Sequence, residues 1–238
     1  MTISNDTRRP PWTRLLAEGP AAVRLLAAQL RPTAQARLAG EGGGRAVMVV
    51  PAFLANDLPT GLLRRTLAAD GYRPSGWKQG VNLGADAKKF ERLLRRIDML
   101  HAETHQDVAL IGWSLGGLYV RELAKRRPDK VALVITLGTP FSRSLRHNNA
   151  WKLYEAINDH DVDHPPVRVE PEEKPPTRTV AIWSPRDGIV APASASGREG
   201  EADEGIEVGC RHNELVSAPE ALDAILSVLA GQRAEKAP

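Results

Sequence analysis

A serine, an aspartate and a histidine are spaced along this sequence in a way that suits nucleophilic catalysis. Ser114 is the centre of the run Gly112-Trp113-Ser114-Leu115-Gly116. A serine hydroxyl is a poor nucleophile near pH 7, so it needs a general base, and that base needs an orienting group. Asp187 and His212 follow it in the chain, each just beyond a stretch with strand character. The order Ser114, Asp187, His212 predicts a nucleophile, an acid and a base that together attack a carbonyl carbon.

The glycines around Ser114 have a physical reason. A serine on a tight turn between a strand and a helix has a strained backbone, and strand and helix nearly touch there. The residues two before and two after the serine must then lack a Cβ atom. An apolar run over 107–111 precedes the turn, and a helical pattern follows it until Pro128. The flanking elements therefore fall where such a turn requires them.

The acid and the base each have competitors. Asp187 precedes Gly188, and an Asp-Gly pair is also a common turn, in which the glycine permits tight geometry. Its place after the apolar run 179–183 favours the role of orienting acid. For the base, only His212 has both the expected order and a position just before the last helix. The other histidines lie in or beside a helix or in an irregular stretch, namely His101, His105, His147, His160 and His164.

These side chains need a scaffold, and the hydrophobic pattern predicts one. Strand-like runs over 46–50, 108–111, 131–137 and 179–183 are almost wholly apolar, and a weaker strand-like run lies at 206–208. Helical patterns lie between them and close the chain from 219 to Gly231. Strands that alternate with helices and are apolar on both faces indicate an α/β fold with a mostly parallel sheet covered by helices on both sides.

We expect two parts: an N-terminal helical extension with a Gly-rich linker over 1–44, and the main domain over 45–238. In the extension, Val23, Leu26, Ala27 and Leu30 share one helical face, which predicts a helix packed on the domain. The alternatives are a lid or a peripheral membrane contact. Within the domain, 141–176 is a cap insertion, because a long Pro-rich and acidic excursion interrupts the pattern there. It holds one short helix from Trp151 to Ile157.

Composition excludes several classes of protein. The 238 residues carry 32 Lys and Arg and 29 Asp and Glu, interspersed along the chain, so no nucleic-acid-binding patch stands out. The single cysteine, Cys210, cannot form an internal disulfide and fits a reducing compartment, which predicts a cytoplasmic protein. No run approaches the roughly 18 apolar residues of a transmembrane span. The oligomeric state is not predicted.

At Ser114, Asp187 and His212 the chain resembles the α/β-hydrolase superfamily, over about residues 45–230, and within it the compact lipase and esterase group. The resemblance implies Ser114 as nucleophile, Asp187 as orienting acid and His212 as general base. It also implies an oxyanion hole with the N–H of Leu115 as one donor. The second donor is open between Phe53 and Leu54, because Pro51-Ala52 stand where the group commonly has His-Gly.

The resemblance implies a serine hydrolase that cleaves a small-molecule carboxylic ester through an acyl-enzyme, without cofactor or metal. Apolar residues are expected to border the acyl group, among them Trp113, Leu54 and Trp151. The alternatives are a thioesterase or an acyltransferase with the same triad, or a catalytically silent binding module of the same fold.

Overall fold

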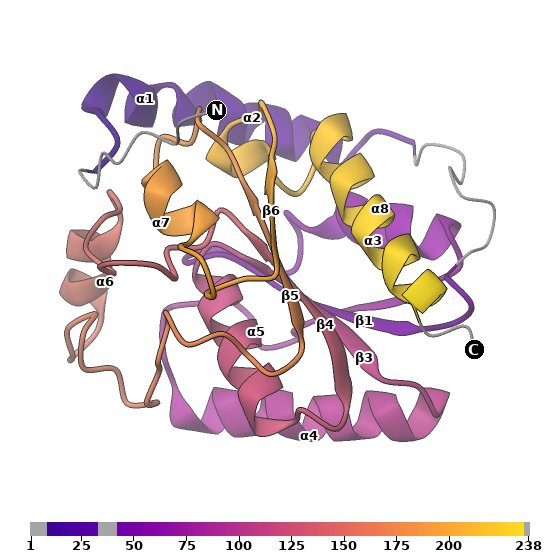
Figure 1. Ribbon diagram of the computed structural model, residues 1–238. Coiled ribbons are helices and arrows are strands. Elements are labelled where there is room, and N and C mark those ends of the chain that lie inside the picture. Colours follow the sequence, from indigo (N-terminus) through magenta and orange to yellow (C-terminus); the bar gives the residue numbers. More distant parts are fainter. Residues whose placement is uncertain (1–8, 33–41, 236–238) are drawn as a thin grey trace.

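The computed structural model describes residues 9–32 and 42–235 and has a six-stranded sheet at its centre (Figure 1). The strands run in the spatial order β2-β1-β3-β4-β5-β6, and every neighbouring pair is parallel. The prediction of an α/β fold with a parallel sheet is therefore confirmed. The strands are β1 (Ala46–Val50), β2 (Arg73–Gly76), β3 (Val108–Trp113), β4 (Val131–Leu137), β5 (Arg178–Trp183) and β6 (Glu204–Glu207).

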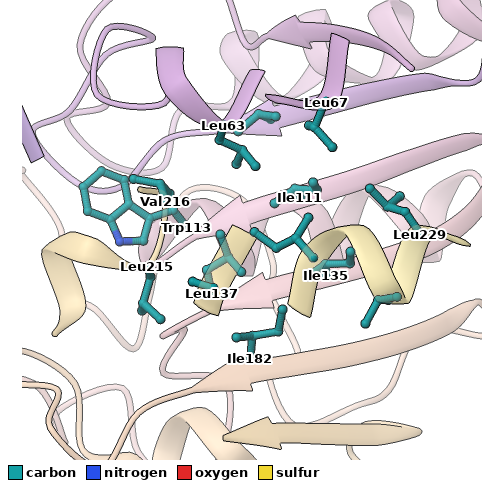
Figure 2. Close-up of a cluster of buried hydrophobic side chains, with 14 of the residues drawn as sticks. Leu63, Leu67, Ile111, Trp113, Ile135, Leu137, Ile182, Leu215, Val216 and Leu229 are labelled. Carbon is teal, nitrogen blue, oxygen red and sulfur yellow. The ribbon is translucent and has the colours of Figure 1, made fainter. Parts of the chain in front are cut away.

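Helices cover both faces of the sheet. On one face lie α2 (Glu18–Ala28), α3 (Gly61–Ala69) and α8 (Pro219–Glu235); on the other lie α4 (Ala87–Thr104) and α5 (Leu115–Arg126). Successive side chains of a strand point to opposite faces, so a strand buried on both sides is apolar at every position. In β1, Val47 and Val49 pack under α3, whereas Met48 and Val50 pack against α4 and α5. Figure 2 shows the first of these two cores, in which leucines of α3 and α8 meet Ile111, Ile135 and Ile182.

Some boundaries differ from those predicted. The last strand is Glu204–Glu207, so it begins two residues before the predicted run 206–208. It lies at the edge of the sheet and most of its side chains are exposed, so its bounds do not follow the apolar residues. Helix α8 continues through Gly231 to Glu235, so the prediction that this glycine ends the helix was wrong. A short helix, α7 (Pro192–Ser196), was not predicted.

The N-terminal extension forms α1 (Trp12–Leu16) and α2, and the predicted packing face of α2 is wrong. Val23, Leu26, Ala27 and Leu30 are all exposed. The buried stripe is instead Glu18, Ala21, Leu25 and Ala28. Small alanines let the helix approach closely, and Glu18 is drawn inward by hydrogen bonds described below. Of the predicted linker 40–44, residues 42–44 form a turn, while 40 and 41, like 1–8 and 33–39, lie outside the described residues.

The stretch from 141 to 176 forms one helix, α6 (Trp151–Ile157), with irregular chain on both sides. The predicted helix in this stretch is thus confirmed in its bounds. Within 9–32 and 42–235, no helix has the length and apolar character needed to cross a bilayer.

Candidate active site

Ser114 occupies a sharp turn between β3 and α5. Its φ of 54° and ψ of −119° lie outside the regions that L-residues favour, and its residue surface is 9% exposed. Its N–H donates to the carbonyl of Leu137 over 2.8 Å, and the Thr139 hydroxyl donates to its carbonyl over 2.9 Å. A Cβ at Gly116 would collide with the backbone at the end of β1, and one at Gly112 would collide with Gly116. The glycines therefore act by permitting close approach, as predicted.

Asp187 and His212 form a buried pair, and they follow the neighbouring strands β5 and β6. Asp187 follows β5, and His212 begins the 3-10 helix η1 (His212–Glu214). The Nδ1 of His212 lies 2.6 Å from Oδ2 of Asp187. The other oxygen, Oδ1, accepts from the N–H groups of Ile189 (2.8 Å) and Val190 (2.7 Å). Because Nδ1 is occupied by the carboxylate, the neutral tautomer favoured here leaves Nε2 as the proton acceptor.

The surroundings of His212 set its affinity for a proton. Burial lowers the pKa of His212, but the negative charge and hydrogen bond of Asp187, and then the charge of Glu18, more than offset this, so that its pKa is raised. Gly138, just after β4, lies beside the pair. A Cβ there would come within 3.0 Å of Nδ1 of His212 and 3.1 Å of Oδ2 of Asp187, and its φ is 56°. Glycine at 138 therefore lets the β4 loop pass beside the acid–base pair.

Gly188 has a different role from the one predicted. Its φ is not among the positive values that require glycine, so a tight turn is not the reason for it. A Cβ there would collide with the carbonyl group of Arg14 in α1 and approach Cγ of Glu18 to 2.9 Å. The loop after Asp187 therefore lies directly against the N-terminal helices.

A cavity opens at Ser114 and is lined almost wholly by apolar side chains. Ser114, Leu115, Phe53 and Trp151 all line it, so the structure brings these four predicted residues together. The loop that carries Asp187 reaches the cavity at Ile189 and Val190, whose N–H groups bind that carboxylate. The charged residue in the lining, Glu122, is paired with Lys125 over 2.8 Å. Further apolar lining comes from α5 and from the 141–176 stretch: Leu118, Leu145, Tyr154, Val162, Val167 and Val169.

Trp113 and Leu54 are not among the residues that line this cavity, so the predicted contacts of these two side chains with the acyl group gain no support from it. Trp113 shares a face of β3 with Ile111 and is buried in the core under α8, because side chains two apart on a strand point the same way (Figure 2). Its indole Nε1 donates to the carbonyl of His212. Leu54 has a φ of 62°, is 46% exposed and does not line the cavity.

The turn after β1 is held by Asn82, which the sequence reading missed. This fully buried side chain donates from Nδ2 to the carbonyl of Pro51 over 2.8 Å. Its backbone carbonyl accepts the N–H of Leu54 over 2.7 Å, and its own N–H donates to Ala55 over 2.8 Å. The N–H of Leu54 is therefore already engaged. No local pattern marks Asn82, since a lone asparagine between glycines reads as an ordinary loop residue.

Comparisons with known proteins agree with this architecture. No protein-family model matches the sequence. A pimeloyl-acyl-carrier-protein methyl ester esterase of Aromatoleum aromaticum is 36% identical over 93 residues, which are 39% of this chain and 33% of that esterase. The match thus spans only about a third of that relative's length.

Two solved structures share the fold. The monoacylglycerol lipase of Paleococcus ferrophilus superposes with a TM-score of 0.56 at 18% identity, covering 79% of this chain and 94% of the lipase. The naproxen esterase of Bacillus subtilis gives 0.54 at 13% identity, covering 96% of this chain and 99% of the esterase. Together with the all-parallel sheet and the turn at Ser114, they confirm the resemblance seen in the sequence: the chain has the α/β-hydrolase fold.

Proposed function

We propose that this protein is a serine hydrolase that cleaves a carboxylic ester through an acyl-enzyme, with Ser114, His212 and Asp187 as its triad. The observation that carries the proposal is the buried Asp187–His212 pair, with Nδ1 and Oδ2 2.6 Å apart, joined to the strained turn of Ser114 through the adjacent Trp113. A carboxylate that holds one imidazole nitrogen leaves the other to take the proton of a serine hydroxyl.

In this proposal the proton and the acyl group move in a balanced sequence. Oγ of Ser114 attacks the ester carbonyl carbon, and its proton passes to Nε2 of His212. The tetrahedral intermediate collapses, the C–O bond to the alcohol breaks, and His212 returns the proton to the leaving alkoxide. Water then attacks the acyl-enzyme by the same route, releasing the acid and free Ser114.

The oxyanion would be held by the N–H groups of Leu115 and Phe53. Leu115 is the first residue of α5, and the first N–H groups of a helix have no partner within it. Phe53 is favoured over Leu54 as the second donor, because the N–H of Leu54 already donates to Asn82. Both donors belong to residues that line the cavity with Ser114.

The apolar lining of the cavity favours a substrate whose acyl group is apolar. Its lining is aliphatic and aromatic apart from Ser114, Asn148 and the paired Glu122. Burial of each methylene of an acyl chain against such a wall contributes about 0.8 kcal/mol. Esters with chains of several carbons should therefore bind better than acetates.

Fluorophosphonate labelling followed by intact-mass analysis tests the proposal, with an ester panel of increasing acyl length beside it. We expect one label per chain, located on Ser114, and a Ser114→Ala variant that is folded, unlabelled and reduced in turnover by about 10⁶-fold. A folded protein that takes no label and cleaves no ester would instead be a binding module. Product analysis with an added alcohol or with thioesters separates an acyltransferase and a thioesterase from an ester hydrolase.

A further inference from the structure

Glu18, the first residue of α2, is an acid buried at the point where three chain segments meet. Its residue surface is only 4% exposed. Oε1 accepts from the N–H of Gly188 over 2.9 Å and from the N–H of His212 over 3.1 Å. Oε2 accepts from the N–H of Asn213 over 3.1 Å. One side chain therefore binds the residue after the candidate acid and the backbone of the candidate base.

The rest of the N-terminal segment is fastened to the same two places. Arg14 donates from Nη1 to the carbonyl of Pro185 over 2.8 Å, on the acid loop. Asn213 donates from its side chain to the carbonyl of Glu18 over 3.3 Å. The close approach at Gly188 leaves no room for a Cβ between that loop and Arg14. The contacts join residues 171 to 195 positions apart, so no local preference of the chain produces them.

We propose that Glu18 is a positioning residue for the triad. It fixes the Asp187 loop and the His212 segment relative to each other by accepting hydrogen bonds from their backbone N–H groups. This inference rests on the proposed function. Charge-assisted hydrogen bonds to a buried carboxylate are about twice as strong as neutral ones, and a carboxylate with N–H donors on both oxygens has one fixed orientation. Without it, the N–H groups of Gly188, His212 and Asn213 lose their acceptor, and the two segments keep the Asp187–His212 contact and the hydrogen bond from the Ser184 hydroxyl to the Cys210 carbonyl.

Glu18 also acts on His212 through its charge. Its carboxylate is one of the groups that raise the pKa of His212. An amide of the same shape would remove that charge, lower the pKa of His212, and keep the imidazole neutral to a lower pH. A purely structural role predicts lower stability but no such displacement of the pH profile. Among the described residues, the charged groups that face His212 or its segment are Asp187 from the β5–α7 loop, Glu18 from α2, the Arg24–Glu214 ion pair between α2 and η1, and Arg211, which directly precedes His212 and interacts with Glu214.

The test compares Glu18→Gln with Leu26→Gln, a change on the outer face of the same helix where the side chain is 62% exposed. For Glu18→Gln we expect kcat to fall between about 10- and 100-fold, the range for a small misplacement of catalytic groups, with KM little changed. The acid limb of kcat/KM should move to lower pH. Leu26→Gln should match the wild type in both. A Glu18→Gln enzyme with wild-type kcat and an unmoved acid limb overturns the proposal.

Histidine NMR separates this outcome from failure of the proposed function. Titration of the His212 ring can be followed in any folded variant, active or not. If Ser114→Ala keeps full turnover, the hydrolase mechanism fails, yet a lower His212 pKa in Glu18→Gln still supports the contact.

If Glu18→Gln does not fold, the test uses Glu18→Asp, which keeps the charge but has a side chain shorter by one methylene. Unchanged kcat in Glu18→Asp then overturns the positioning role, and a lowered kcat with nearly unchanged His212 titration supports it.

Discussion

The indole Nε1 of Trp113 donates a hydrogen bond to the main-chain carbonyl of His212 over 3.2 Å. Trp113 directly precedes the candidate nucleophile, so this bond ties the end of β3 to the segment that carries the candidate base. The two rings also lie close, with centroids 6.1 Å apart. Trp113, a residue expected to border the acyl group, is instead buried and hydrogen-bonded to the segment of His212.

Replacing Trp113 by Phe keeps an aromatic ring in the core but removes this donor. We expect a loss of about 0.5–1.5 kcal/mol in the free energy of unfolding, because one buried hydrogen bond is lost while the His212 carbonyl keeps the N–H of Leu215 at 3.3 Å, and a clear fall in kcat. Trp77→Phe is the matched control, since its buried indole donates to the carbonyl of Gly80 over 2.9 Å, far from His212 along the sheet. It should lose comparable stability in urea unfolding but keep its kcat. Equal losses of kcat in both variants would contradict a local role for Trp113.

The pH dependence of kcat/KM should report His212. The proposed mechanism needs the neutral imidazole of His212 as proton acceptor. Burial lowers the pKa of His212, but the charge and hydrogen bond of Asp187 more than offset this, so that its pKa is raised. Activity should therefore rise with pH through a midpoint above the ordinary histidine value of about 6.5. Asp187→Asn should move this midpoint to lower pH and cut turnover by about 10⁴-fold, because the wrong tautomer is then favoured. A wild-type midpoint well below 6 would show that another group is titrating.

Asn82→Ala should weaken the turn after β1, which carries the proposed oxyanion donor Phe53, while leaving Ser114 unchanged. The variant loses the bond from Nδ2 to the carbonyl of Pro51 (2.8 Å) and leaves that buried acceptor unpaired, a cost of about 1–3 kcal/mol. Loosening the turn that carries Phe53 should lower kcat more than it raises KM, because the oxyanion forms only in the transition state. Fluorophosphonate labelling of Ser114 should persist at a reduced rate. Wild-type kcat in a folded Asn82→Ala variant would remove Phe53 from the oxyanion hole.

The cap stretch offers a paired test of substrate contact on a single helix. Trp151 lines the cavity, whereas Leu153, two residues later in α6, is 49% exposed. Trp151→Ser should lower kcat/KM for long-chain esters more than for acetate esters. Each methylene of the acyl chain that is no longer buried against an apolar side chain loses about 0.8 kcal/mol of binding free energy. Leu153→Ser should leave the chain-length profile unchanged. Parallel losses across all chain lengths in Trp151→Ser would indicate general destabilisation of α6 instead.

The parts of the site that the sequence predicts are those fixed by local sterics and by strand order. The turn at Ser114 needs glycine on both sides, because a Cβ at Gly112 would meet Gly116 and a Cβ at Gly116 would meet the backbone at the end of β1. Asp187 could be placed because parallel strands deliver their following loops to one edge of the sheet. The position of Trp113 was also readable, since it lies two residues after Ile111 on the same face of β3.

The parts that the sequence did not reveal depend on contacts between distant segments. The buried stripe of α2 consists of alanines, Leu25 and the charged Glu18, so the apolar pattern pointed to the opposite face. A carboxylate is buried there only because N–H donors from Gly188, His212 and Asn213 converge on it. Asn82 is similar, because its partners at Pro51 and Leu54 lie about 30 residues away. Neither residue carries a signal within its own neighbourhood.

The hydrogen bonds between Glu18 and the segments of Gly188 and His212 can form only late in the synthesis of the chain. As the chain is synthesised, α2 emerges about 170 residues before Gly188 and about 194 before His212. A growing chain that has completed β1, β3 and β4 already has the turn at Ser114 but neither the acid nor the base. Contacts of such high sequence separation carry the largest loop-closure cost and form slowly. During biosynthesis the turn at Ser114 can therefore form before the proposed acid and base have been synthesised, and Glu18 gains its three donors only when nearly the whole chain is present.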